Sequence, residues 1–369
     1  MIYVPIIKNR KAELSAIRKC VDCFDESIIP LFEIINNQYI PRFKMNSNGE
    51  RIMELKPGHK KRTPIKLEST EEDVCTLKNI NETVGHNRCF IEYFRYSEDE
   101  YPNSRIDLSK VSLSRELSLN YKKYADNTAS ICKYPNFIPI ISIKKGFRIS
   151  DSDLIDLIKN IREQGHILGI RIQIGLFDNY QAIMEEALGE DDYLLVDIGE
   201  APYRSQFFLL QDVETSRIKA KRILINSPRH KNDIKRDYQL DGWEPLIDNA
   251  VAVKYSECGF SGFGDYAGLK DSLPEDIPVR SVILGLLFNK DKNAFWSIKS
   301  KEKGDCAEVK KKALEHSNEF DAEGSCKGYK EIKRIEKGTQ MNWNEITVIR
   351  YIDQISINWF QCQVQKCDS

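Results

Sequence analysis

Short apolar runs recur through the first three quarters of the chain and alternate with segments of helical spacing. The runs are rich in β-branched residues and have the length of buried strands. We predict eight strands: Tyr3–Ile7, Ile28–Ile35, Cys89–Phe94, Phe137–Ile143, Ile167–Ile174, Tyr193–Ile198, Arg222–Ile225 and Ala250–Val253. Most of the intervening segments carry apolar residues three or four positions apart, which predicts helices; one follows the N-cap residues Ser150 and Asp151.

Alternating strands and helices indicate a parallel sheet with helices packed outside it. The predicted strands are continuously apolar, as expected for strands buried on both faces. Eight such units over about 270 residues match a closed (β/α)8, TIM-like barrel. The alternative is an open doubly wound sheet, but the glycine fingerprint GxGxxG does not follow the first strand.

The strand–helix rhythm ends near residue 274, which predicts a barrel over 1–274 and a smaller α+β subdomain over 275–369. In the second segment we expect strands over 278–288 and 294–298, a charged helix over 307–316 and a β-rich segment over 346–359. Residues 38–66 interrupt the barrel pattern as a basic insertion, read as a long loop or hairpin.

Composition narrows the choice of partners. The net charge is −1, so any nucleic acid would have to be bound by a local patch. The N-terminus lacks the pattern of a signal peptide, and the apolar runs are too short to span a bilayer, so we expect a cytoplasmic protein with no membrane partner. Cys20 and Cys23 form a CxxC motif within an apolar segment, but a second ligand pair is missing, so we expect no metal site there.

Charged residues within the apolar strands, or at their ends, are the candidate site. In a closed barrel the carboxyl ends of the strands meet at one rim, where barrel enzymes have their active sites. The predicted strands place ten polar residues there: Lys8, Arg10, Glu33, Glu92, Lys144, Arg171, Asp197, Asn226, Lys254 and Asp265. Charged residues are seldom buried without partners, so this group requires an explanation.

We weigh two explanations for the rim residues. In the first they form a binding pocket, with Lys8, Arg10, Glu92, Arg171, Asn226 and Asp265 as ligand-binding residues and Glu33, Asp197 and Lys254 as catalytic candidates. The cations would bind an anionic group such as phosphate, and converging carboxylates would provide acid–base chemistry or hold a divalent cation. In the second the same groups form ion pairs that stabilise the rim. Asp265 also suits a turn or an N-cap.

The basic insertion is the local candidate for nucleic acid. Residues 38–66 contain eight Lys or Arg against two acids, a net charge of +6, together with Tyr39 and Phe43 for stacking on bases. The alternative is a solvated hairpin that covers the mouth of the barrel. The five histidines lack ligand spacing, and neither a GxSxG elbow nor a P-loop is present.

Several short motifs resemble the phage and bacterial "beta protein" family. They are an N-terminal strand with Pro5, Lys8 and Arg10, then Glu13-Leu14 and Pro30-Leu31-x-Glu33, the strand end at Asp197, and Phe263-Gly264-Asp265-Tyr266. Trp343 is present, but Arg350-Tyr351-Ile352 stands where the family pattern has a histidine pair followed by isoleucine. The resemblance implies a protein of phages and mobile bacterial loci, in the setting of antiviral defence and near nucleases.

Together these patterns predict a barrel rim that binds a phosphate-bearing small molecule or nucleotide, with hydrolytic chemistry as an option. The alternative is a non-catalytic component that recognises a protein or nucleic-acid partner and regulates an associated nuclease, the protein partner coming from the same defence locus. The pattern of residues identifies neither a cofactor nor a reaction, so whether the chain is an enzyme stays open.

Overall fold

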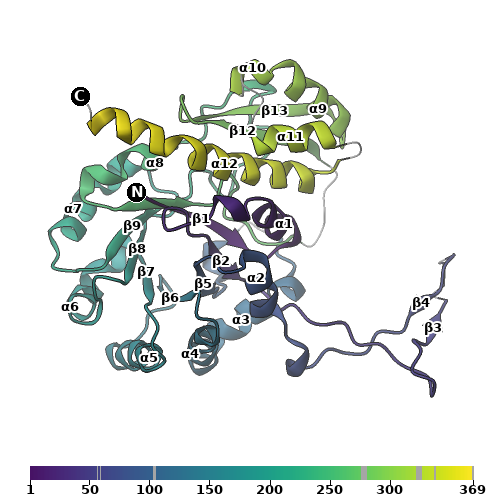
Figure 1. Ribbon diagram of the computed structural model, residues 1–369, viewed down its shortest axis with the longest axis horizontal. Coiled ribbons are helices and arrows are strands. Elements are labelled where there is room, and N and C mark those ends of the chain that lie inside the picture. The colour runs from purple at the N-terminus through teal and green to yellow at the C-terminus, as the bar shows by residue number, and fades with distance from the viewer. Residues whose placement is uncertain are drawn as a thin grey trace.

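The fold is a closed barrel of eight parallel strands with a smaller unit packed on one side (Figure 1). The computed structural model describes residues 1–55, 57–58, 60–102, 105–275, 281–320, 326–335 and 338–367, with side chains of the last helix as far as residue 356. The barrel strands are β1 (Ile2–Lys8), β2 (Leu31–Ile34), β5 (Cys89–Tyr93), β6 (Phe137–Ile143), β7 (Gly169–Gln173), β8 (Tyr193–Asp197), β9 (Lys221–Ile225) and β11 (Gly262–Asp265). Each pairs in parallel with the next, and β11 closes the ring against β1, so the predicted TIM-like barrel is confirmed.

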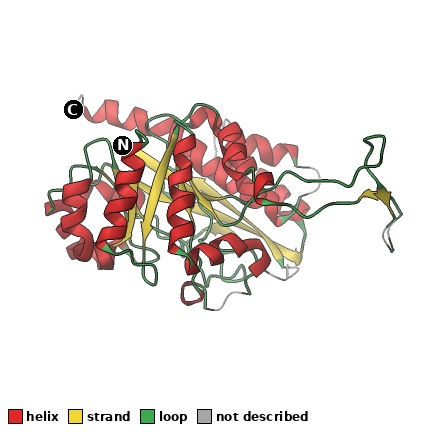
Figure 2. Ribbon diagram, turned by 90° about the horizontal axis from the view of Figure 1, so that it is seen from below, coloured by secondary structure: helices red, strands yellow, loops and turns green. Residues whose placement is uncertain are grey.

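Helices surround the barrel, and their apolar faces cover its outer wall (Figure 2). They are α1 (Lys11–Lys19), α2 (Thr76–Val84), α3 (Ser112–Leu119), α4 (Tyr121–Ser130), α5 (Asp151–Glu163), α6 (Phe177–Ala187), α7 (Phe207–Thr215) and the short α8 (Val251–Lys254). Ser150 caps α5 as predicted, because its hydroxyl oxygen accepts a hydrogen bond from the Asp153 amide at 3.2 Å.

The prediction for the eighth strand was wrong. Residues 250–253 contribute to the helix α8, and the strand is the glycine-rich β11 instead. A Cβ on Gly262 would lie 1.9 Å from the carbonyl oxygen of Ile2, so only glycine allows β11 to approach β1 this closely. Glycine is depleted in strands, and a four-residue apolar run does not distinguish helix from strand, so the pattern favoured the wrong segment.

The smaller unit combines an antiparallel sheet with helices. Its sheet has the order β10 (Asp241–Trp243), β13 (Ala294–Lys303) and β12 (Val282–Asn289), and its helices are α9 (Cys306–Glu315), α10 (Ser317–Phe320), α11 (Lys327–Arg334) and α12 (Gln340–Cys367). The first three residues of the predicted strand 278–288 lie outside the described residues. Because β10 precedes residue 275 in sequence and pairs with β13, the chain enters this sheet before the barrel is complete.

The predicted β-rich segment 346–359 is wrong as well, because it lies within the long helix α12. One side of α12 packs into the core of the smaller unit through Trp343 and Ile346. Another side joins the barrel core through Val348, Tyr351 and Ile352. A helix that is buried on two sides loses the apolar stripe that marks a surface helix, and its β-branched residues then resemble a strand.

Residues 38–66 form a hairpin that extends far from the barrel, with β3 (Met53–Glu54) and β4 (Thr63–Pro64) near its end (Figures 1 and 2). The insertion is therefore a hairpin, one of the two forms expected, but it does not cover the mouth of the barrel as the alternative supposed. Within the described residues, no helix combines the length and apolar character needed to cross a bilayer.

Candidate functional site

Charged side chains from neighbouring strands occupy one layer inside the carboxyl end of the barrel. Lys8 of β1 is in register with Glu33 of β2, and Glu33 is in register with Glu92 of β5. Side chains in register on adjacent strands point to the same side of a sheet. Arg171 of β7 reaches this layer from across the barrel, so the predicted convergence of these four residues is confirmed.

Arg171 is the centre of the layer and binds three carboxylates. Its Nη1 donates to Glu33 Oε1 at 2.7 Å and to Glu92 Oε2 at 2.9 Å. Its Nε and Nη2 donate to Asp197 Oδ2 at 2.9 and 2.6 Å, and Nη2 also donates to the Tyr266 hydroxyl at 3.3 Å. A guanidinium has five N–H donors, so these contacts use its donor capacity and fix its position.

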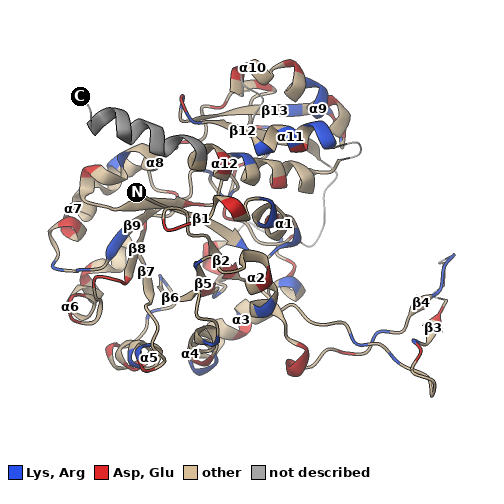
Figure 3. Cartoon of the chain, viewed as in Figure 1, with Lys and Arg blue, Asp and Glu red and all other residues tan. Residues whose placement is uncertain are grey.

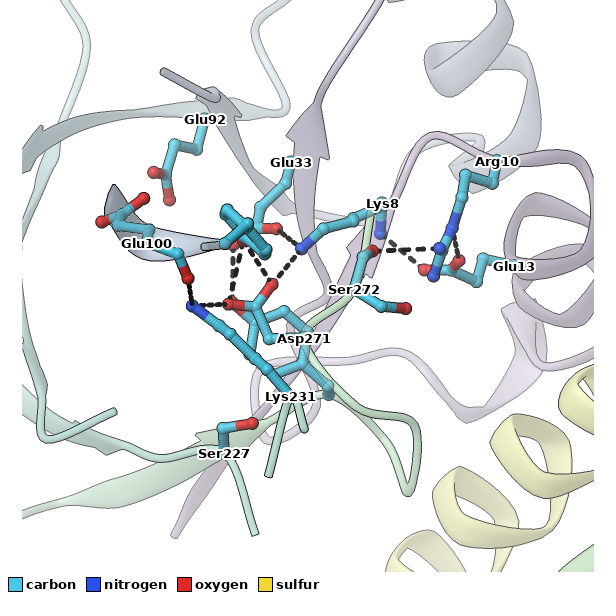
Figure 4. Close-up of polar contacts among 12 residues, drawn as sticks. Lys8, Arg10, Glu13, Glu33, Glu92, Glu100, Ser227, Lys231, Asp271 and Ser272 are labelled. Atoms are coloured by element: carbon cyan, nitrogen blue, oxygen red, sulfur yellow. Dashed lines mark hydrogen bonds and ion pairs between the residues drawn. The ribbon is translucent and has the colours of Figure 1, made fainter. Parts of the chain in front are cut away.

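Lys8 is the second buried cation, and its side chain is held by two acids (Figure 4). Its Nζ lies 2.5 Å from Glu33 Oε2 and 2.7 Å from Asp271 Oδ1. The ring of Tyr266 lies beside the ammonium, with its centroid 4.6 Å from Nζ, and the Tyr266 hydroxyl donates to Glu33 Oε1 at 3.0 Å. We call the connected group the rim network: Lys8, Glu33, Glu92, Arg171, Asp197, Tyr266 and Asp271.

The buried cations of the network keep Glu33 and Asp271 ionised. Burial alone would raise the pKa of Glu33, but Lys8 and Arg171 outweigh it and hold that pKa below its ordinary value. Burial likewise opposes ionisation of Asp271, and Lys8 with Lys231 holds the pKa of Asp271 far below its usual range. Burial would lower the pKa of Lys8, whereas Asp271 and Glu33 raise it. At neutral pH Lys8, Glu33 and Asp271 are therefore all charged.

A small cavity of ≈ 90 Å³ opens above the network. Five residues of the rim network line it: Glu92, Arg171, Asp197, Tyr266 and Asp271. The other lining residues are Phe94, Glu100, Tyr101, Ser142, Ile143, Lys144, Gln173, Gly199, Glu200, Ser227 and Lys231. The volume suffices for several waters or a small polar group.

Two further lysines that line the cavity differ in their exposure. The side chain of Lys144 is 11 % exposed, and its Nζ lies 2.7 Å from Glu100 Oε2. The side chain of Lys231 is 25 % exposed, and its Nζ lies 3.0 Å from Asp271 Oδ2 (Figure 4). Lys231 can exchange its carboxylate partner for another anion at lower cost than Lys8 or Arg171, because water still reaches it. Lys144 is nearly as buried as Arg171, whose side chain is 8 % exposed.

Three predicted site residues lie away from this cavity. Arg10 turns toward Glu13 and donates to the carbonyl oxygen of Ser272 at 3.0 Å (Figure 4). Asn226 lines a separate, smaller cavity beyond β9. Lys254 ends the helix α8 rather than a strand, so its placement at the rim was wrong for the same reason as the eighth strand.

Asp265 ends β11, which was not predicted as a strand, and its side chain does not line the predicted pocket. It follows Gly264, whose position faces Ile225 and Val4, and its own side chain points to the outer wall. There it accepts hydrogen bonds from the hydroxyls of Tyr3 at 3.0 Å and Tyr351 at 2.7 Å and from the Ala267 amide at 2.8 Å. Burial raises its pKa to about 6, against the effect of these donors. The residue thus joins β1, β11 and α12.

The sequence argument missed several cavity residues. Tyr266 directly follows Asp265, and the alternation of side chains along an extended segment was a usable signal for it. Asp271, Lys231 and Tyr101 lie in loops, and Glu100 ends a single turn of 3-10 helix, so spacing does not report which of them meet. Lys144, expected at the rim, does line the cavity.

The three carboxylates that were considered for a divalent cation converge on the guanidinium of Arg171 instead. Among the described residues, no group of three or more His, Cys, Asp or Glu is arranged to hold a metal ion.

Comparisons with known proteins add little to this geometry. No protein-family model matches the chain, and no curated protein matches it. Among solved structures, the tryptophan synthase complex from Pyrococcus furiosus has 10% identity and a TM-score of 0.39, and the match covers 72% of this chain and 87% of that chain. A mutant tryptophan synthase α-subunit from the same organism has 10% identity and a TM-score of 0.38, covering 72% and 86%. The chain is therefore assigned to the parallel eight-stranded barrels by its own strand order, and the beta protein resemblance stays a prediction.

Proposed function

We propose that the rim cavity binds a small, phosphate-bearing polar molecule. The observation that carries the proposal is the mixed lining of the cavity: Arg171 holds the carboxylates of Glu92 and Asp197, and the lysines Lys144 and Lys231 line the same cavity. Such an arrangement suits a ligand with hydroxyl groups at one end and an anionic group at the other.

The anionic group would be held by Lys144 and Lys231. Each would exchange its present carboxylate partner for a phosphate oxygen, which accepts the same charge-assisted hydrogen bond. Ser227 lines the cavity from the loop after β9, the seventh barrel strand in sequence. Loops after the seventh and eighth strands are frequent phosphate sites in barrels of this type, which supports this placement.

Hydroxyl groups of the ligand would be held by Glu92 and Asp197. Both carboxylates are oriented by Arg171 and line the cavity. Glu33 is fully buried, and its oxygens accept from Lys8, Arg171 and Tyr266, so it serves as a positioning residue. If the bound molecule is hydrolysed, Asp197 is the side chain placed to accept a proton from water.

The size of the cavity favours a small ligand over a nucleotide. Pockets for drug-sized molecules have volumes of about 300–1,000 Å³. The present cavity has ≈ 90 Å³, so a nucleotide would have to leave its base outside. We therefore propose a phosphosugar or a molecule of similar size.

The proposed setting is a cytoplasmic protein of the beta protein family in a phage-defence locus, and it rests on the sequence motifs. Seven cysteines are free thiols, as is usual for a protein kept in a reducing compartment: Cys20, Cys23, Cys75, Cys89, Cys132, Cys258 and Cys306.

A thermal-shift screen with inorganic phosphate, glycerol 3-phosphate, ribose 5-phosphate and AMP tests the proposal. A ligand that binds only the folded state raises the melting temperature, by about 2–5 °C at a concentration well above its Kd. We expect the shift in the wild-type protein and its loss in Lys144→Ala and Lys231→Ala. The matched control is Lys145→Ala, because that neighbouring lysine is exposed and does not line the cavity.

If none of the four compounds raises the melting temperature, the proposal is contradicted. The second candidate, a non-catalytic component that recognises a macromolecule, is then favoured. The observation that favours this candidate is that Lys8 and Arg171 already form ion pairs with carboxylates of the network.

A further inference from the structure

The hairpin that extends from the barrel differs from the rest of the molecule in both shape and charge. We call residues 41–67 the arm, excluding Lys56 and His59, which lie outside the described residues. Its chain runs out from the barrel, forms a side turn at residues 46–50 and returns through β3 and β4. Figures 1 and 2 show it projecting well beyond the helices, and it contributes nothing to the barrel core.

Positive charge is concentrated on this projection (Figure 3). Residues 38–66 carry a net charge of +6, whereas the whole chain carries −1, so the remaining residues carry −7. The seven basic side chains that the structure describes there are all exposed: Arg42, Lys44, Arg51, Lys60, Lys61, Arg62 and Lys66. A polyanion would therefore meet the arm first and be repelled by the body.

The basic side chains of the arm are weakly engaged by the protein itself. Arg42 lies 3.6 Å from Asp73 at the base of the arm, and Arg51 stacks over the ring of Phe43 at 4.3 Å. Exposed ion pairs of this kind contribute little to stability, so they do not explain why the chain maintains such a projection. An isolated two-stranded hairpin is marginal in water, which also suggests that the arm is completed by a partner.

Large apolar side chains alternate with the cations along the arm. Met45, Met53, Leu55 and Leu67 are between 44% and 58% exposed. Cations on a β-ribbon with apolar side chains between them are the combination that ribbon-type DNA-binding proteins use, the cations at phosphates and the apolar groups in a groove.

We propose that the arm binds duplex DNA, with its ribbon in a groove and its lysines and arginines at the phosphates. The major groove of B-DNA is about 12 Å wide and admits a two-stranded ribbon. Duplex RNA fits less well, because its major groove is deep and narrow. Single strands fit less well too, because they are bound by exposed aromatic platforms, and the Phe43 ring is covered by Arg51.

The test is fluorescence anisotropy of the full-length protein with a labelled 25-base-pair DNA of arbitrary sequence, at several salt concentrations. Each neutralised phosphate contributes about −0.9 to the slope of log K against log salt, so four to six contacts give a slope of about −4 to −5. The triple variant Lys60→Gln, Lys61→Gln and Arg62→Gln should reduce the slope by about 3 and weaken binding by about tenfold or more at 100 mM salt.

The matched control removes three exposed lysines from the helices around the barrel and the smaller unit: Lys78→Gln, Lys159→Gln and Lys311→Gln. It has the same net charge as the arm variant and should bind DNA as the wild-type protein does. Circular dichroism melts should show both triple variants folded, because the altered residues are exposed.

Four results would overturn the proposal. One is a wild-type protein that does not bind the duplex at 50 mM salt. Another is equal loss of binding in the control and the arm variant, which would indicate a non-specific charge effect. The third is a dimer that dissociates only in the arm variant, measured by light scattering, since the arm would then dock on the acidic body of a second copy. Preference for a single strand of the same sequence would also exclude the duplex as partner.

Discussion

At the scale of single residues, the buried charged side chains fall into two groups. Some hold other side chains in position, and the others line the cavity. Lys8, Glu33, Glu92 and Arg171 were predictable from sequence, because a charge inside an apolar strand is conspicuous and must have a partner. Asp271 was not predictable, because its contact with Lys8 spans a sequence separation of 263 residues and joins a strand to a loop. Pairing across such distances follows from closure of the barrel and not from local spacing.

Asp265 provides a residue-scale prediction about pH. Its pKa is raised to about 6, so its contribution to stability is fully present below the unfolded value near 4 and is lost as the pH rises through 6. This rise in the pKa of Asp265 corresponds to a loss of about 3 kcal/mol in unfolding free energy. Asp265→Asn should remove most of this loss, because the amide oxygen still accepts from Tyr3 and Tyr351 can accept from the amide nitrogen.

Urea unfolding of the wild-type protein and Asp265→Asn at pH 4.5 and 7.5 measures the effect. The variant should lose less unfolding free energy between the two pH values than the wild-type protein does. Asp191→Asn, at an exposed position, is the control and should follow the wild-type protein. An unchanged pH dependence in Asp265→Asn would contradict the role given to the buried carboxyl group.

At the scale of elements, the sequence pattern identified the strands that are buried on both faces, because such strands are continuously apolar. Seven of the eight predicted barrel strands overlap those observed. The eighth and the helix α12 were missed for opposite reasons. In β11 two glycines replace the expected apolar residues, because the neighbouring backbone lies too close for a side chain. The helix α12 packs on two cores and therefore carries apolar residues on more than one side. The hydrophobic period that marks a surface helix is then lost.

Gly262→Ala tests the element-scale account of barrel closure. The new methyl group would lie 1.9 Å from the Ile2 carbonyl oxygen, so β1 and β11 must separate. We expect a loss of about 3 kcal/mol or more in unfolding free energy, at the upper end of overpacking effects. Gly175→Ala is the matched control, since a Cβ there meets nothing within 4 Å, and it should change stability little. Equal effects of the two variants in urea titrations would refute this account.

At the scale of the whole molecule, the chain separates an acidic barrel body from a basic arm. The class of fold was predictable because it follows from the number and spacing of apolar runs. The projection of the arm away from the barrel was not predictable, because net charge and turn residues indicate an insertion without giving its direction. The two proposed sites are thus separate, one in the body and one on the arm, and a variant in one should leave the ligand response of the other unchanged.

We propose that the rim network is a binding site in which the buried Glu33 and Arg171 hold Glu92 and Asp197 in position. Isothermal titration of the tightest-binding compound of the phosphate panel, into the wild-type protein, Asp197→Asn and Glu33→Gln, tests it most directly, with unfolding free energies measured alongside. Glu33→Gln should lose about 3–5 kcal/mol of stability, because it leaves a buried cation short of a partner.

Asp197→Asn should keep its stability within about 1 kcal/mol, since Arg171 retains Glu33 and Glu92, while its Kd for the compound rises about tenfold or more. If Asp197→Asn instead loses as much stability as Glu33→Gln and binds the compound as the wild-type protein does, the network is structural and the proposed site is wrong.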